Sequence, residues 1–139
     1  RNLGIRYLTG LEYCRNLEWL DLDTNKISSI KPLEQLGRPE SPFDSPLGYL
    51  NLDSNEITDI TPLAGLLNLY QISLFDNQIA DLQALVANAA AGGLGPGDQL
   101  IVDSATLSEA ALTIDVPTLV SYGVRVSLVV PAGGDGTAK

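Results

Sequence analysis

The sequence predicts an α/β repeat solenoid, in which the chain winds into coils that each add one short strand to a parallel sheet. Two observations predict it. Three stretches beginning at Leu17, Leu47 and Leu69 share the pattern LxxLxLxxNxI, and each continues with an apolar residue about every third position. A repeat period of roughly 20–50 residues is typical of solenoids, because one coil cannot bury its apolar side alone.

Each part of the pattern predicts one part of a coil. In LxL the two leucines point inward from a strand and the residues between them point outward. The threefold spacing that follows suits a 3₁₀ or extended return path on the convex side. Asn25, Asn55 and Asn77 mark the bend between the two, where buried backbone groups need hydrogen-bond partners. We therefore predict a structural role for the three asparagines.

The spacing of the repeats locates an insertion. Asn55 and Asn77 are 22 residues apart, whereas Asn25 and Asn55 are 30 residues apart, because the segment 37–46 is longer in the first coil. This segment contains three prolines and, at its centre, Phe43. Since extra loops on a solenoid rim often carry specificity, we treat Phe43 as a secondary binding candidate, with a neutral insertion as the alternative.

The two ends of the array depart from the regular repeat. Residues 1–16 predict a partial first coil, in which Cys14 takes a core position and behaves as a small buried hydrophobe. Regular and irregular repeats fill residues 17–107, and the asparagine ladder is expected to stop where Ala105 replaces the asparagine. The chain begins at Arg1 rather than Met, so we expect a processed chain or a piece of a longer protein.

Residues 108–130 predict a C-terminal cap that closes the core. Ser108 can cap a helix over residues 109–114, Pro117 suits the first turn of a second helix, and Gly123 can end that helix. Alternating apolar residues over 124–130 predict a last strand. We expect one domain over residues 1–130 and a flexible tail over 131–139.

Composition narrows the chemistry of this 139-residue chain. It has no histidine and one cysteine, which excludes zinc sites, Ser-His-Asp and Cys-His catalysis, and an internal disulfide within these residues. A net charge of −9 disfavours nucleic acid and anionic membranes as partners. No run of about 18 apolar residues is present, so we expect no membrane insertion.

The remaining residues give little support for catalysis or metal binding. Asp21 and Asp53 could resemble a glycosidase pair, but we expect them on a shallow, open face where nothing raises a pKa. The glycine-rich segment 92–98 has no following lysine and joins no strand to a helix, so it does not predict a phosphate loop. Clustered aspartates lack the compact loop of a cation site. We therefore predict no enzyme, no cofactor and no metal.

The outward strand positions predict a binding face. Strands in a sheet lie about 4.8 Å apart, so these positions gather into columns across the coils. Large exposed aromatics rimmed by charge are typical of interaction hot spots, although aspartates can also simply keep a sheet soluble. The candidate partner-binding residues are Trp19, Asp21, Asp23, Tyr49, Asn51, Asp53, Phe75 and Asp76.

These repeats resemble the 22-residue leucine-rich repeats of bacterial internalin-like surface proteins. The matching phrases include Leu8-Thr-Gly-Leu-Glu-Tyr-Cys, Ile60-Thr-Pro-Leu and Asn55-Glu-Ile-Thr-Asp-Ile, and the cap phrases Val116-Pro-Thr-Leu and Gly123-Val-Arg-Val. The resemblance covers about residues 3 to 130. It implies a right-handed leucine-rich-repeat superhelix with its sheet on the concave face, protein recognition there, and an extracellular or cell-surface location.

The leading hypothesis is a non-catalytic module that binds a basic or mixed-charge protein or peptide on the concave sheet. One rival is a spacer or assembly unit of a larger bacterial surface protein. Another is the recognition domain of a longer enzyme.

Overall fold

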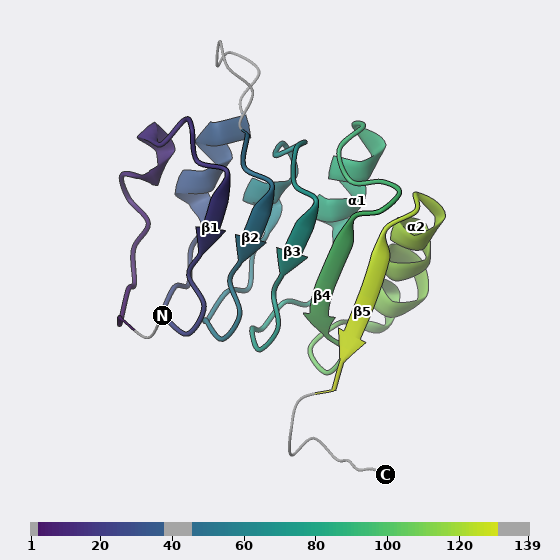
Figure 1. Ribbon diagram of the computed structural model, residues 1–139. Coiled ribbons are helices and arrows are strands. Elements are labelled where there is room, and N and C mark those ends of the chain that lie inside the picture. The colour runs from purple at the N-terminus through teal and green to yellow at the C-terminus, as the bar shows by residue number, and fades with distance from the viewer. Residues whose placement is uncertain (1–2, 38–45, 131–139) are drawn as a thin grey trace.

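The computed structural model describes residues 3–37 and 46–130, which form a stack of coils around one core (Figure 1). Five parallel strands form one sheet in chain order. They are β1 (Trp19–Asp21), β2 (Tyr49–Asn51), β3 (Gln71–Ser73), β4 (Gln99–Asp103) and β5 (Arg125–Val129). The sheet order confirms the predicted solenoid, since each coil places its strand beside that of the coil before it.

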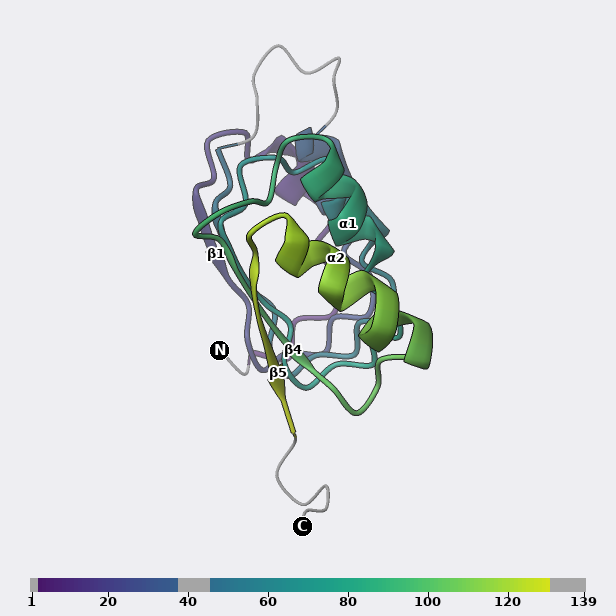
Figure 2. The same ribbon diagram turned by 90° about the vertical axis from the view of Figure 1, so that its right-hand side faces the viewer.

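Helical segments cover the other side of the sheet (Figure 2). The first three are 3₁₀ helices, as predicted: η1 (Leu11–Tyr13), η2 (Lys31–Gly37) and η3 (Thr61–Leu63). In the next coil the segment is an α-helix, α1 (Gln83–Ala90), which the sequence analysis did not predict. Unlike η2 and η3, α1 contains no proline, and four of its eight residues are alanine, the strongest helix former.

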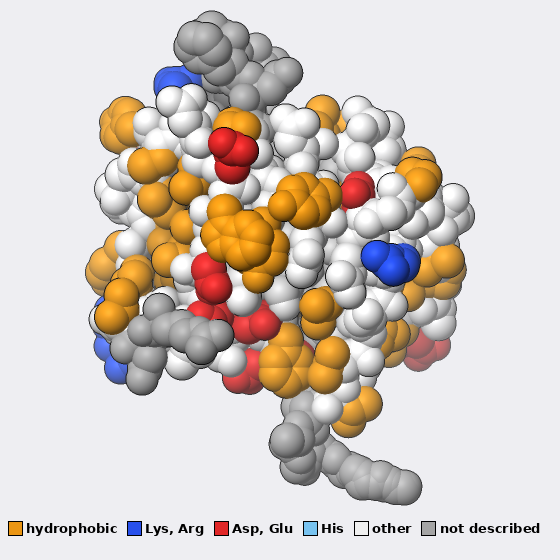
Figure 3. Space-filling model, viewed as in Figure 1, with side chains coloured by type: hydrophobic (Ala, Val, Ile, Leu, Met, Phe, Trp, Pro, Cys, Tyr) orange, Lys and Arg blue, Asp and Glu red, His pale blue; other side chains and the backbone are white. Residues whose placement is uncertain are grey.

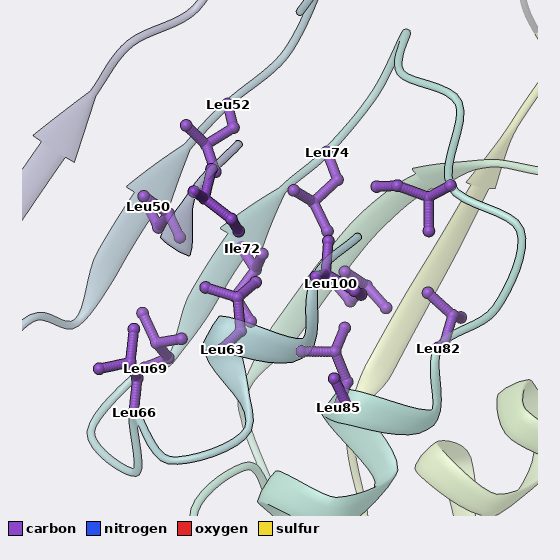
Figure 4. Packing of buried hydrophobic residues seen from close by; sticks show 14 of the residues in the cluster. Leu50, Leu52, Leu63, Leu66, Leu69, Ile72, Leu74, Leu82, Leu85 and Leu100 are labelled. Carbon is purple, nitrogen blue, oxygen red and sulfur yellow. The ribbon is translucent and has the colours of Figure 1, made fainter. Parts of the chain in front are cut away.

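The core is built from inward side chains that stack from coil to coil (Figure 4). Strand register places one apolar ladder at the centre of the sheet, and the return segments supply a second set of side chains facing it. The ladder consists of Leu20, Leu50, Ile72, Leu100 and Val126. Truncating one of its buried leucines to alanine should cost about 2–5 kcal/mol.

The asparagine ladder is confirmed. Asn55 accepts a hydrogen bond from Ile27 N (3.0 Å) and donates to the carbonyls of Leu22 (3.1 Å) and Leu52 (3.0 Å). Asn77 repeats this arrangement one coil later, accepting from Ile57 N and donating to Leu52 O and Leu74 O. Each buried amide therefore joins its own coil to the preceding one.

A second repeated hydrogen bond lies at the start of η2, η3 and α1. It was not predicted from the sequence. A Ser29 hydroxyl accepts from Lys31 N (3.3 Å), and the Asp59 and Asp81 carboxylates do the same for the N–H two residues on, at 2.9 and 3.1 Å. These residues hold equivalent positions in successive coils. The signal was a Ser or Asp two residues before each segment, which is typical of local side-chain turns.

The prediction of a buried Cys14 is wrong. Leu8 of the partial first coil is buried, but Cys14 is exposed, and its thiol lies 3.9 Å from Gly10 O. The first coil ends in a tight turn after η1, with hydrogen bonds from Arg15 N to Tyr13 O and from Leu17 N to Cys14 O. That turn carries the cysteine outward, away from the position that the repeat frame assigns to it.

The cap differs from the prediction in its helices. In place of two helices, a π-helical turn, η4 (Ala111–Asp115), continues directly into α2 (Val116–Ser121). The buried carboxylate of Asp115 accepts from Leu82 N (3.0 Å), which ties the cap to the start of α1. The predicted ends are confirmed: Ser108 Oγ accepts from Ala111 N (3.1 Å), and Gly123 has a φ of +96°.

The last strand follows the predicted alternation only in part. Val124 is buried, while Leu128 and Val130 are 40% and 65% exposed. Phe43, most of the insertion 37–46 and the tail 131–139 lie outside the described residues. The domain boundaries stay a prediction.

Candidate functional site

The strand register assembles the predicted candidates on one face of the sheet. Trp19 pairs with Tyr49, which pairs with Gln71, and Asp21 pairs with Asn51, which pairs with Ser73. The next outward positions lie beyond the ends of the first three strands and stay in step through main-chain hydrogen bonds. We call the eight residues Trp19, Asp21, Asp23, Tyr49, Asn51, Asp53, Phe75 and Asp76 the aromatic–acidic face.

The first feature of this face is a stacked aromatic pair. The rings of Trp19 and Tyr49 are 3.6 Å apart between centroids and inclined by 10°. Trp19 keeps 59% of its surface exposed, because it lies on the terminal strand and has a neighbouring ring on one side. Figure 3 shows hydrophobic side chains gathered over β1 and β2, with acidic side chains beside them.

The acidic part of the face is more buried than the sequence suggested. Asp53 Oδ1 accepts hydrogen bonds from Ser73 Oγ (2.6 Å) and Phe75 N (2.8 Å). Burial raises the pKa of Asp53, and repulsion from Asp23 and Asp21 adds to it, against the two hydrogen bonds. The prediction that nothing on this face raises a pKa is therefore wrong.

Asp103 extends the acidic group beyond the predicted residues. It is buried, its Oδ1 accepts from Asp76 N (2.8 Å), and burial followed by repulsion from Asp76 and Asp53 raises its pKa. It occupies the same outward column as Asp53 and Phe75, so the repeat frame offered the signal that identifies it.

Some of these side chains also support the local backbone. Asp21 Oδ1 accepts from Asp23 N (3.2 Å), and Asn51 Oδ1 accepts from Asp53 N (2.9 Å). These bonds lead into turns where Thr24, Ser54 and Asp76 have positive φ values of 56–60°. Asn51 and one oxygen of Asp21 therefore serve the fold as well as the surface.

A second apolar group lies on the far side of the acidic residues. Phe75 is half-buried, Ile101 of β4 lies diagonally across from it next to Ser73, and Val129 of β5 pairs with Asp103 one strand further on. Sequence reasoning missed Val129, because the register of β5 could not be assigned without a repeat motif. The face thus has two apolar groups separated by carboxylates.

Two solved structures are similar to this fold. One is internalin C2 from Listeria monocytogenes, with a TM-score of 0.67 and 26% identity over 91% of this chain. The other is a second internalin (inlF) from the same organism, with a TM-score of 0.59 and 27% identity over 76% of this chain. The chain is an internalin-like leucine-rich-repeat protein. No family model and no curated protein matches the sequence.

The internalin-like chain corresponds to only part of these structures, since the match spans 48% of the internalin C2 chain and 33% of the second. Both neighbours share its repeat architecture, so the resemblance inferred from the motifs is confirmed. Among the described residues, no helix is long and apolar enough to span a bilayer.

Two hollows among the described residues are lined by side chains outside the aromatic–acidic face. One of about 450 Å³ is lined by residues of the convex side, including Ser28, Lys31 and Asp59, and one of about 350 Å³ lies beside Tyr13 and Cys14. Within the described ranges, no three acidic or cysteine side chains are placed to hold a metal ion.

The aromatic–acidic face offers a ligand aromatic stacking, apolar contact and negative charge.

Proposed function

We propose that this chain is a non-catalytic protein-binding module that contacts a partner protein or peptide with the aromatic–acidic face. The observation that supports it best is the Trp19–Tyr49 stack, in which Trp19 keeps 59% of its surface exposed. Trp and Tyr are enriched among residues that dominate binding energy. The surrounding carboxylates favour a basic or mixed-charge partner, and the internalin neighbours make an extracellular or cell-surface setting the natural one.

A capture experiment tests this function. The double variant Trp19→Ala/Phe75→Ala should retain much less partner from a native extract than the unaltered chain. The matched control is Tyr7→Ala/Tyr13→Ala, which removes two aromatics that are 81% and 77% exposed outside the face. Equal capture by the unaltered chain and a folded Trp19/Phe75 variant would refute the proposal.

An assembly role is the second candidate, because exposed apolar side chains also cluster at the N-terminal coil. Leu3, Tyr7 and Tyr13 are each at least 75% exposed there. Self-association that rises with concentration in light scattering, and that Tyr7→Ala/Tyr13→Ala abolishes, would favour assembly over partner binding.

A further inference from the structure

The aromatic–acidic face has a defined internal spacing. Tyr49 pairs with Gln71, and Phe75 follows Gln71 by four residues, two of them past the end of β3, where Ser54 N still donates to Phe75 O. Four residues cover about 13 Å along a strand and one strand step adds about 4.8 Å across, so the two aromatics are about 14 Å apart. An extended peptide covers this distance in about four residues.

Carboxylates lie between these two aromatic positions. Asn51 marks the midpoint, since it is two residues from Tyr49 and pairs with Ser73. Asp21 pairs with Asn51 on the other side, and Asp53 follows Asn51 by two residues. Among the described residues, all hydrogen bonds to Asp21 and Asp53 reach Oδ1, which leaves each Oδ2 able to accept from a ligand.

We infer that the partner presents an extended segment with the pattern apolar–x–basic–x–apolar. This inference specifies the partner of the proposed function and rests on it. Side chains at positions i, i+2 and i+4 of an extended segment point to the same face. The two apolar side chains contact the Trp19–Tyr49 pair and the Phe75 group. The basic side chain between them lies against Asp21 and Asp53.

Charge complementarity favours a cation at the central position. Asp53 is desolvated and repelled by Asp21 and Asp23, so an opposite charge beside it relieves a cost that the unbound face carries. Arginine suits the position well, because its planar guanidinium can bond two carboxylates and stack on an aromatic ring. The charged neighbours that raise the pKa of Asp53 in the unbound chain are two further carboxylates, Asp23 and Asp21.

Short synthetic peptides test the pattern, and Trp19 reports binding because it is the only tryptophan in the chain. The probe is the blocked heptapeptide Ser-Leu-Ser-Arg-Ser-Leu-Ser. The charge control replaces arginine by uncharged citrulline. The spacing control, Ser-Leu-Arg-Ser-Leu-Ser-Ser, has the same composition with leucines three residues apart. Fluorescence titration at low salt should give at least about tenfold tighter binding for the probe than for either control.

Variants assign the preference to the named carboxylates. Asp21→Asn/Asp53→Asn should bring the arginine-to-citrulline affinity ratio close to one, and so should about 0.5 M salt, which screens surface charge. Glu56→Gln/Glu109→Gln removes the same net charge from exposed positions elsewhere and should keep the ratio. Near-ultraviolet circular dichroism and thermal unfolding check that each variant is folded.

The outcomes separate this inference from the proposed function. Equal affinity for the three peptides, no saturable binding of the probe, or an arginine preference that survives Asp21→Asn/Asp53→Asn would overturn the pattern. If partner capture still required Trp19 and Phe75, the proposed function would stand with a different partner segment. If capture did not require them, the proposed function itself would fail.

Discussion

The ring of Trp19 lies 3.6 Å from the ring of Tyr49, almost parallel to it, although 30 positions separate the two residues in the chain. The contact exists because the register of β1 and β2 pairs the two residues directly. It stiffens the most exposed part of the aromatic–acidic face, so a ligand would meet a rigid aromatic surface.

Removing the Tyr49 ring should weaken both the fold and the aromatic–acidic face. Tyr49→Ala should reduce the free energy of unfolding by about 1 kcal/mol through loss of the stack, and it should change the fluorescence of Trp19. Denaturant unfolding and emission spectra measure the two effects. Tyr13→Ala, at a 77% exposed side chain, is the control and should do neither; an equal loss in both variants would contradict a stabilising stack.

The asparagine ladder should be worth more than any single surface contact. Asn55→Ala removes four hydrogen bonds to two coils and leaves buried backbone groups without partners. Because each buried unpaired group costs about 1–3 kcal/mol, the variant should lose about 3 kcal/mol or more in chemical denaturation. Asn16→Ala, at an exposed position, should change stability by less than about 0.5 kcal/mol. Similar stability of the two variants would argue against the ladder.

The raised pKa of Asp53 predicts a pH-dependent effect of neutralising it. The folded chain holds the Asp53 proton more tightly than the unfolded chain does, so this carboxyl favours folding most below its ordinary pKa of 3.8. That contribution is lost as the pH rises through the folded-state pKa. Asp53→Asn should therefore raise Tm at pH 7, and the gain should shrink as the pH falls towards 3.

Asp59 provides the control of opposite sign. Hydrogen bonds from the N–H and hydroxyl of Thr61 lower the pKa of Asp59, so its charge favours folding above pH 3.8 and this contribution is lost on acidification. Asp59→Asn removes the same charge but should lower Tm at pH 7. Thermal scans from pH 3 to pH 7 compare the variants, and a shift of the same sign in both would rule out this explanation.

The left-handed turns predict a stabilising substitution. Thr24 has a φ of +58°, which is strained for a β-branched residue and free for glycine. Thr24→Gly should raise the free energy of unfolding by up to about 1 kcal/mol. Thr58→Gly, at an exposed position without a positive φ, should lower it by about 0.5–1 kcal/mol. Destabilisation by both substitutions would show that the turn strain is small.

The exposed position of Cys14 predicts ready reaction with a thiol reagent. Ellman's reagent should label the thiol of the folded chain at a rate within about tenfold of the denatured chain, because burial does not shield it. Cys14→Ala should change stability by less than about 0.5 kcal/mol. A thiol that reacts only after unfolding would restore the buried position assigned by the repeat frame.

Local pattern predicted much of this molecule because a solenoid repeats the same short-range constraints. The inward leucines, the bends at Asn25, Asn55 and Asn77, and the outward columns all follow from a period that is visible in the chain. The residues at the ends were harder to assign. Cys14 has the right spacing for the core, but no preceding coil among the described residues holds it there.

The sequence by itself determined the architecture and the candidate face, since alternation along each strand decides which side chains point outward. Only the tertiary structure decided how those side chains meet: the stacking of Trp19 on Tyr49, the burial of Asp53 and Asp103, and the link from Asp115 to α1. These features depend on register and on packing between coils that are about 20 to 30 residues apart. Repeat spacing determines the order of the coils. The burial of side chains and the interactions between charged side chains arise only after the coils have stacked.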